Sequence, residues 1–207
     1  MFNRRNSVTR SHKIDTVLGA LKEQLFPGMS EPSFIVRRLG NPDADTFRFI
    51  RLESLQQNPN DFGSTFEKES NEPSASFVER FDRNTVFGGF VRERLMGIVG
   101  FSPLEGSKRS HIGVLWGMYV RPEARGTGLA TALVESLIEA GRERVEQIQL
   151  TVVASNARAR RFYQRMHFSE YGLEKKALKY NGVYFDEVLM VSIFLRLGLL
   201  LARYAKA

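Results

Sequence analysis

The sequence predicts an α/β domain in which strands and helices alternate and further strands lie at both ends. Between residues 112 and 166 the apolar residues switch repeatedly between a period of two and a helical period. β-type segments precede and follow that part of the chain. We therefore expect one domain over residues 34–194, a basic N-terminal extension with a short helix at 1–33, and a C-terminal extension at 195–207.

The first half of this domain is divided by a polar segment. That segment is rich in Asn, Asp, Gly and Ser and is expected to be a loop. Two later β-type segments, separated by three residues, predict a hairpin. In chain order we expect a strand, a helix, the loop, a helix and the two hairpin strands at 34–39, 46–57, 58–75, 76–82, 85–91 and 95–101.

The second half alternates strand and helix before it ends in another hairpin. Every second residue from Ile112 to Val120 is apolar, which predicts a strand with one well-buried face. The pair Asn181-Gly182 is typical of a two-residue hairpin turn. In chain order we expect a strand, a helix, a strand, a helix and the closing hairpin at 112–120, 129–140, 148–153, 159–166 and 177–194.

The composition fits a globular protein and excludes cysteine chemistry. The chain has 207 residues, 43% of them hydrophobic and 26% charged, which is enough apolar material for a sizeable core. It contains no cysteine. Disulfides, thiolate metal sites and an acyl intermediate on cysteine are therefore excluded, and we expect no metal.

The net charge of +7 at pH 7 points to a polyanionic partner, which includes nucleic acid, an acidic membrane and a phosphorylated cofactor. The excess is local. Residues 1–13 contribute +4, residues 121–165 contribute +3, and the remainder is balanced. A nucleic-acid binder needs a basic face with aromatic residues interleaved for stacking. We therefore expect no nucleic-acid partner.

The hydropathy pattern gives no membrane span. The longest apolar candidate, at 188–201, is interrupted by Ser192, Arg196 and Gly198 and is shorter than the roughly 20 residues required. The basic start at 1–13 lacks the apolar region of a secretory signal. We expect a cytoplasmic protein with no membrane partner. An organelle transit peptide, which shares a basic start, is the alternative.

The segment that carries chemistry joins a strand to a helix and reads Arg-Gly-Thr-Gly-Leu-Ala at 125–130. Glycines at such a junction let backbone N–H groups converge at the positive end of the helix dipole, which suits a phosphate. The residue three beyond Gly128 is Thr131, so the dinucleotide fingerprint does not fit, and no P-loop Gly-Lys pair follows. A tight turn without a ligand is the alternative.

With its neighbours, this segment resembles the acyl-CoA motif of the GNAT acyltransferase superfamily. That motif reads R/Q-x-x-G-x-G/A, and Arg125–Ala130 matches it after a strand that ends near Pro122. About thirty residues later the superfamily has N-x-x-A-x-x-x-Y followed by Gly-Phe. The matching residues are Asn156, Ala159, Tyr163 and Phe168, and His167 stands where glycine is usual.

The resemblance covers roughly residues 85–194, and more loosely the chain from Phe34 onward. It implies a mixed, largely antiparallel central sheet of about six to seven strands flanked by helices. It also implies that a splayed strand pair forms a cleft for CoA. The donor would be acetyl-CoA, which acts as a cosubstrate.

The resemblance also implies roles for individual residues. Backbone amides of 125–130 would hold the pyrophosphate, main-chain groups of Met118 and Val120 would pair with the pantetheine arm, and Asn156 would hydrogen-bond that arm. Tyr163 would donate a proton to the departing thiolate, a task that suits a phenol protonated at neutral pH. A core aromatic is the other interpretation of Tyr163. The expected cofactor-binding residues are Met118, Tyr119, Val120, Arg125, Gly126, Thr127, Gly128, Leu129, Ala130, Asn156 and Ala159.

The sequence does not assign a role to four arginines, to the general base or to the residues of the acceptor pocket. Each arginine is expected on a solvated helix face, although one or two of them could reach the 3′-phosphate of CoA; they are Arg158, Arg160, Arg161 and Arg165. Some relatives place a glutamate five positions before the asparagine, but Thr151 stands here. Candidate bases are His111, Asp186 and Glu187, each of which suits a structural role equally well. Candidate acceptor-pocket residues are Tyr180 and Tyr184, although tyrosines on a hairpin are more often packing residues.

The hypothesis that follows is an N-acetyltransferase acting by direct transfer on a primary amine of a small molecule or peptide. The alternative is a non-catalytic module that senses acyl-CoA or scaffolds a complex, which the residues Thr151 and His167 leave open. The apolar stretch 195–204 is compatible with a homodimer interface or with an extension of the core.

Overall fold

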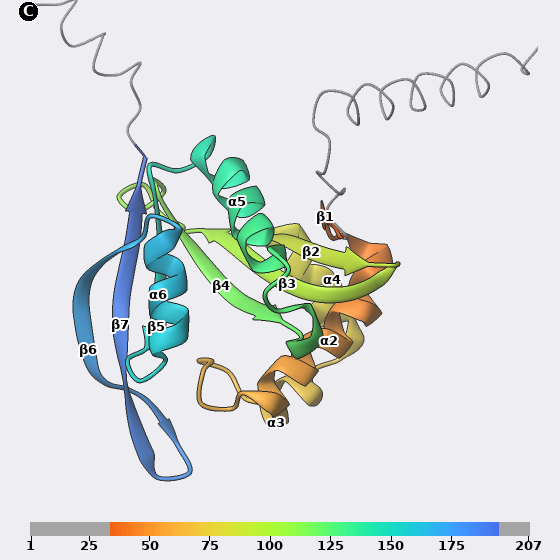
Figure 1. The fold of residues 1–207 in the computed structure, drawn as a ribbon, viewed down its shortest axis with the longest axis horizontal. Coiled ribbons are helices and arrows are strands. Elements are labelled where there is room, and N and C mark those ends of the chain that lie inside the picture. Colours follow the sequence, from red (N-terminus) through yellow and green to blue (C-terminus); the bar gives the residue numbers. More distant parts are fainter. Residues whose placement is uncertain (1–33, 195–207) are drawn as a thin grey trace, which may run out of the picture. The chain divides into compact units, whose positions relative to one another are not determined.

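The computed structural model describes residues 34–194, and Figure 1 shows its arrangement of helices and strands. The helix expected within 1–33 and the apolar stretch expected at a dimer interface lie outside the described residues. The strands are β1 (Ile35–Arg38), β2 (Thr85–Val91), β3 (Arg94–Pro103), β4 (Ile112–Val120), β5 (Gln147–Val153), β6 (Ser169–Tyr180) and β7 (Val183–Ile193). The helices are η1 (Asn41–Asp43), α2 (Ala44–Gln57), α3 (Phe66–Ser70), α4 (Ser74–Arg83), η2 (Pro122–Ala124), α5 (Leu129–Arg142) and α6 (Ala157–Arg165).

The seven strands form a single mixed sheet in the order β1-β2-β3-β4-β5-β7-β6. All neighbouring pairs are antiparallel except β4 and β5. The described residues therefore confirm the predicted α/β class and the largely antiparallel sheet. Both predicted hairpins are present, β2–β3 in the first half and β6–β7 at the end.

The sheet splits between its two parallel strands. β4 and β5 pair only where residues 112–114 face 147–149. Beyond that point β4 continues beside β3 and β5 continues beside β7, so the two strands diverge (Figure 1). The edge of β4 from Leu115 to Val120 is left without a strand partner on the β5 side among the described residues. This is the predicted splayed strand pair.

Two hydrophobic clusters cover the two faces of the sheet. Successive residues of β3 belong to different clusters, because side chains alternate between the faces of a strand. Val99 packs in the cluster that contains α5, whereas Ile98 packs with α2 and α4. Figure 1 accordingly shows α5 and α6 on one face and α2 and α4 on the other. Helix α6 joins the first cluster through Tyr163 and Met166.

Two expectations about local structure are wrong. The predicted loop at 58–75 contains α3, whose first turn is capped by the Thr65 hydroxyl accepting from the Lys68 N–H at 3.2 Å. In β4, the alternate residues expected to be buried, such as Trp116 and Met118, are only half-buried, while Leu115 and Tyr119 are buried in different clusters on opposite faces of the sheet. The reason is an irregularity in the β3–β4 pairing, where Gly117 has a φ of +64°, which interrupts the alternation of faces along β4.

Candidate functional site

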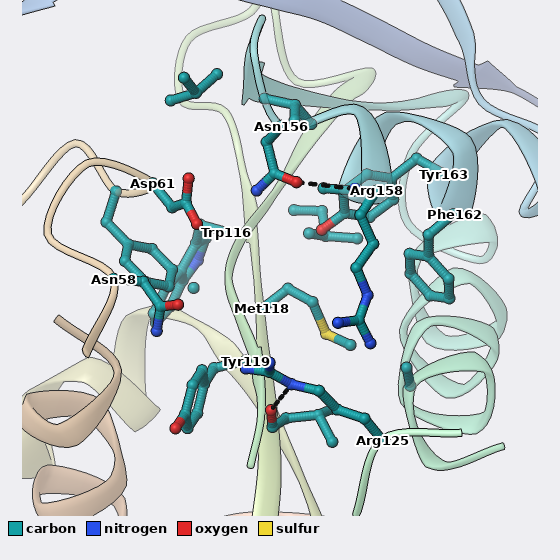
Figure 2. A pocket seen from close by; sticks show the side chains of 18 of the residues that line it. Asn58, Asp61, Trp116, Met118, Tyr119, Arg125, Asn156, Arg158, Phe162 and Tyr163 are labelled. Atoms are coloured by element: carbon teal, nitrogen blue, oxygen red, sulfur yellow. Dashed lines mark hydrogen bonds between the residues drawn. The ribbon is translucent and has the colours of Figure 1, made fainter. Parts of the chain in front are cut away.

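A cavity of about 700 Å³ lies where β4 and β5 diverge. Its walls come from the α2–α3 loop, β4, the turn before α5, the end of β5 and α6, as Figure 2 shows from close by. Most of the residues predicted for the site line it: Met118, Tyr119, Val120, Arg125, Gly126, Gly128, Ala130, Asn156, Ala159 and Tyr163. The segments that the sequence placed thirty residues apart therefore meet at one cavity.

Thr127 and Leu129 are the two predicted site residues that do not line this cavity. The Thr127 hydroxyl donates to the Ala124 carbonyl at 2.8 Å and closes the turn. Leu129 is fully buried in the core, where its side chain fills the space above Gly89. The side chains of Thr127 and Leu129 therefore stabilise the turn. Only the backbone of these two residues could contact a ligand.

The turn before α5 depends on two glycines. Gly126 has a φ of +83° and Gly128 a φ of +90°. Residues with a Cβ are strained in this left-handed region, whereas glycine is not. The two glycines therefore permit the tight path from η2 into α5 along the wall of the cavity.

Several backbone N–H groups of this turn are free to bind an anion. Among the described residues, five have no hydrogen-bond acceptor: those of Gly126, Thr127, Gly128, Ala130 and Thr131. The cluster lies at the N-terminus of the 14-residue helix α5, where the helix dipole favours negative charge.

Two amides of the predicted cradle are engaged elsewhere. The Arg125 N–H donates to the Pro122 carbonyl at 3.2 Å, so it is not free in this structure. The Leu129 N–H makes a long contact of 3.4 Å with the Thr127 hydroxyl. The free set starts at Gly126 and extends to Thr131, one residue beyond the predicted segment.

Three arginine side chains make this part of the cavity basic. Arg125 lines it and is held by its Nε, which donates to the Val120 carbonyl at 2.9 Å. Arg158 and Arg165 also line it while remaining exposed, so these two are the arginines placed to reach a phosphate of the donor. Arg160 instead pairs with Glu170 at 3.0 Å, and Arg161 is exposed and does not line the cavity.

Asn156 and Tyr163 lie on the α6 wall of the cavity (Figure 2). Asn156 caps the helix, because its Oδ1 accepts from the Ala159 N–H at 3.0 Å. The amide Nδ2 of Asn156 makes no hydrogen bond within residues 34–194 and is available to a ligand. The cap fixes the orientation in which that group is presented.

Tyr163 is 7% exposed and packs between Phe162 and Phe168, at ring-centroid distances of 5.2 and 5.8 Å. Burial raises the pKa of its phenol above the ordinary value. The hydroxyl therefore stays protonated throughout the neutral range, as a proton donor requires. Packing and proton donation are compatible here, because the ring lies in the core while the residue also lines the cavity.

His167 occupies the position where the family pattern has glycine. Its φ is +63°, and α6 ends there with the Phe168 N–H donating to the Tyr163 carbonyl at 3.0 Å. This left-handed helix ending favours glycine for its backbone freedom alone. The histidine therefore keeps the same backbone path, and its exposed side chain does not reach the main cavity.

The candidate bases differ in their relation to the cavity. His111 is exposed at the paired end of β4, and Asp186 accepts from the Lys176 N–H at 2.7 Å within the β6–β7 hairpin. Only Glu187 touches a residue of the cavity wall, because it accepts from the Thr151 hydroxyl at 2.9 Å. The two candidate acceptor tyrosines, Tyr180 and Tyr184, do not line the cavity.

The wall opposite α6 was missed in the sequence. It is formed by Asn58, Asp61 and Phe62 from the α2–α3 loop together with Trp116 of β4. No motif marks these residues, since a polar loop segment gives no sign of the surface that it faces. The Trp116 ring is fixed by its Nε1, which donates to the Ser102 hydroxyl at 2.7 Å.

A buried ion-pair network supports this loop at its base. Arg51 of α2 pairs with Glu69 of α3 at 2.7 Å, and Arg80 of α4 reaches the same carboxylate at 2.8 Å. The Arg51 guanidinium also lies 5.1 Å from the centroid of the Phe62 ring. Three helices therefore hold the two ends of the loop that carries Asn58 and Asp61.

The acetyltransferase (GNAT) family model matches residues 51–168, more than half of the 207-residue chain. This chain belongs to the GNAT family. The match spans the turn at 125–131, Asn156 and Tyr163, so the cavity is built from the segments that define the family match. The chain is accordingly an acyltransferase by family.

Solved structures with the same fold include other GNAT proteins. A ribosomal-protein-alanine N-acetyltransferase from Brucella melitensis is 22% identical, with a TM-score of 0.68 over 77% of this chain and 99% of that one. An acetyltransferase of the GNAT family from Streptococcus pneumoniae is 21% identical, with a TM-score of 0.64 over 78% and 99%. A putative acetyltransferase from Salmonella typhimurium, solved with its cofactor acetyl-CoA, is 16% identical, with a TM-score of 0.66 over 79% and 95%.

The described part of the chain has neither a metal-binding group nor a helix that could span a membrane. Within residues 34–194, no group of three or more histidine, aspartate or glutamate side chains is placed to hold a metal ion. No helix in that range has both the length and the apolar character needed to cross a membrane.

Proposed function

We propose that the GNAT cavity of this protein makes it a cytoplasmic N-acetyltransferase, which transfers the acetyl group of acetyl-CoA directly to a primary amine of a small molecule or peptide. The observation that carries the proposal is the meeting of free amides, Asn156 and Tyr163 at one cavity. A donor with a pyrophosphate at one end and a thioester at the other would contact the free amides, Asn156 and Tyr163. The alternative function, an acyl-CoA sensor without turnover, uses the amides and Asn156 and requires only packing from Tyr163.

Binding of the donor follows from the charge and the free edges of the cavity. The amides at 126–128, 130 and 131 and the side chains of Arg125, Arg158 and Arg165 suit the phosphates. The open edge of β4 at 115–120 offers main-chain groups to the amides of the pantetheine arm, as a neighbouring strand would. Asn156 offers its Nδ2 on the opposite wall.

In the transfer step, the neutral amine nitrogen attacks the thioester carbonyl carbon. A C–N bond forms, the C–S bond breaks, and the departing sulfur takes the phenolic proton of Tyr163. The raised pKa of Tyr163 keeps that proton in place until negative charge develops on the sulfur. The attacking amine loses its own proton to water, and Tyr163 then regains a proton from solvent.

The experiment is release of free CoA thiol from acetyl-CoA against a panel of amines, amino acids, polyamines and peptides, together with calorimetric titration of acetyl-CoA. We expect binding and turnover with at least one class of acceptor. The protein adds no thiol background, because it has no cysteine. Tight binding without turnover across the panel would establish the sensor, and no binding at all would exclude both functions.

A further inference from the structure

The cavity is chemically divided between its two ends. Its three arginines lie on the turn before α5 and on α6, whereas Asp61 is the only carboxylate among its lining residues. Figure 2 shows Asp61 on the α2–α3 loop, far from Arg125 and on the wall opposite Tyr163. Phosphates therefore fit one end of the cavity, and a cation fits the other.

Asp61 is available to a ligand. Within residues 34–194 its carboxylate accepts no hydrogen bond and forms no ion pair, while its backbone N–H donates to the Asn58 carbonyl at 3.1 Å. The side chain is exposed into the cavity rather than buried in the loop. Arg51 of the ion-pair network below the loop is paired with Glu69 at 2.7 Å. An incoming ammonium group therefore finds an unpaired carboxylate.

Apolar side chains contribute much of the cavity lining around Asp61, beside the amides of Asn58 and Asn156. These side chains are Phe62, Trp116 and Met118, and the Trp116 ring is held in place by its hydrogen bond to Ser102. Aromatic faces attract cations and also pack against methylene groups. An aliphatic chain that spans this surface would extend from Asp61 toward the thioester.

A carboxylate that paired with the reacting nitrogen would hold it in the ammonium form, which cannot attack. The productive use of Asp61 is therefore to bind a second cation of the acceptor, away from the reacting nitrogen. With the donor bound, its phosphates occupy the arginine end of the cavity, so Asp61 is the carboxylate of the cavity wall that is left to bind the second cation.

We propose that the acceptor is an aliphatic diamine, one of whose nitrogens binds Asp61 as an ammonium while the other is acetylated. This inference rests on the proposed function, because it assigns the acceptor of the same cavity. It predicts that selectivity comes from the charge at the far end of the acceptor.

The test compares three acceptors of similar length with different distal groups: putrescine, butylamine and γ-aminobutyrate. With the wild-type protein we expect kcat/KM to decrease in that order. Asp61→Asn should lower kcat/KM for putrescine by about 5- to 20-fold, the size of one charge-assisted contact at a partly open site, and leave the value for butylamine unchanged. Glu67→Gln is the matched control, since Glu67 is an exposed carboxylate on α3 outside the cavity.

The outcomes separate this inference from the proposed function. Turnover in which butylamine equals putrescine, or in which a lysine-containing peptide is strongly preferred to putrescine, would overturn the diamine acceptor and leave the N-acetyltransferase intact. Absence of turnover with every amine would overturn the function itself. In that case calorimetric titration of putrescine into the CoA complex still tests whether Asp61 binds a cation. Equal affinities of Asp61→Asn and the wild type for putrescine would exclude this site.

Discussion

Tyr163 combines two roles that are hard to distinguish in a sequence. It is buried between Phe162 and Phe168 and also lines the cavity between β4 and β5. The burial that packs the ring is the same burial that raises the pKa of the phenol. A tyrosine at this position therefore stays protonated at neutral pH without help from a neighbouring charge.

The substitution Tyr163→Phe tests this residue directly. We expect kcat to fall by about 100- to 1,000-fold, the usual contribution of a general acid, with little change in the affinity for acetyl-CoA. Steady-state kinetics and calorimetric titration measure the two quantities. The fold should be kept, because the ring remains in its aromatic cluster. An unchanged kcat would assign Tyr163 to packing alone.

At the scale of elements, the two glycines in the turn between η2 and α5 allow a backbone conformation that leaves several N–H groups without an acceptor. A Cβ added at Gly126 would meet nothing within 4 Å, so the protein itself leaves this space open. The φ of +83° nevertheless strains any residue other than glycine. Local backbone conformation, rather than packing, is therefore what the sequence motif specifies here.

We predict that Gly126→Ala weakens acetyl-CoA binding by about 10-fold, since it strains the cradle and puts a methyl group beside the phosphates. Gly106→Ala is a matched control, because Gly106 has a φ of +90°, also meets nothing within 4 Å and lies outside the cavity. Both variants should lose about 1 kcal/mol of unfolding free energy. Equal affinities of the two variants for acetyl-CoA would contradict the cradle.

At the end of α6, a substitution to glycine should increase the free energy of unfolding, whereas Gly126→Ala should decrease it. His167 has a φ of +63° at a position that favours glycine. His167→Gly should raise the free energy of unfolding by about 0.5 to 1 kcal/mol and leave turnover unchanged, because the side chain does not reach the main cavity. Chemical denaturation measures the free energy of unfolding. His167→Ala keeps the Cβ, so a gain of the same size in that variant would refute the backbone explanation.

At the scale of the whole molecule, the layer of α2, α3 and α4 is held by a buried charge network. Burial alone would raise the pKa of Glu69, but the hydrogen bonds and charges of Arg51 and Arg80 outweigh burial and lower it. A carboxylate whose pKa is lower in the folded than in the unfolded state stabilises the fold above the unfolded value of about 4.3. That contribution is lost as the pH falls through the folded pKa.

Acid unfolding tests this network. The free energy of unfolding should decrease as the pH is lowered below about 4, and Glu69→Gln should be less stable by about 3 kcal/mol at pH 7 with a shallower loss in acid. Glu67→Gln, an exposed carboxylate on the same helix, should behave as the wild type. An acid transition with the same slope in both variants would show that Glu69 does not contribute.

Much of the fold could be predicted from the sequence because its elements carry strong local signals. The alternation at 112–120, the helical spacing after Gly128 and the Asn181-Gly182 turn each fix one element. The short helix α3 was missed, since five residues are too few for a periodic pattern and its Thr65 cap lies within a polar segment.

The candidate site also has a part that could be predicted from the sequence and a part that could not. The donor half could be predicted because its residues lie on two contiguous motifs, although the engaged Arg125 amide required the three-dimensional turn. The acceptor half could not, because Asn58, Asp61 and Trp116 come from a loop and a strand with no common spacing. Only the packing of α2, α3 and α4 brings that loop to the cavity.

The central claim is that one cavity between β4 and β5 holds acetyl-CoA and performs the transfer. A crystal structure of the protein with CoA tests this most directly. We expect the pyrophosphate on the amides at 126–128, 130 and 131, the pantetheine arm between the open edge of β4 and Asn156, and the sulfur within hydrogen-bond reach of the Tyr163 hydroxyl. A pyrophosphate bound away from this turn, or a sulfur that cannot reach Tyr163, would contradict the account.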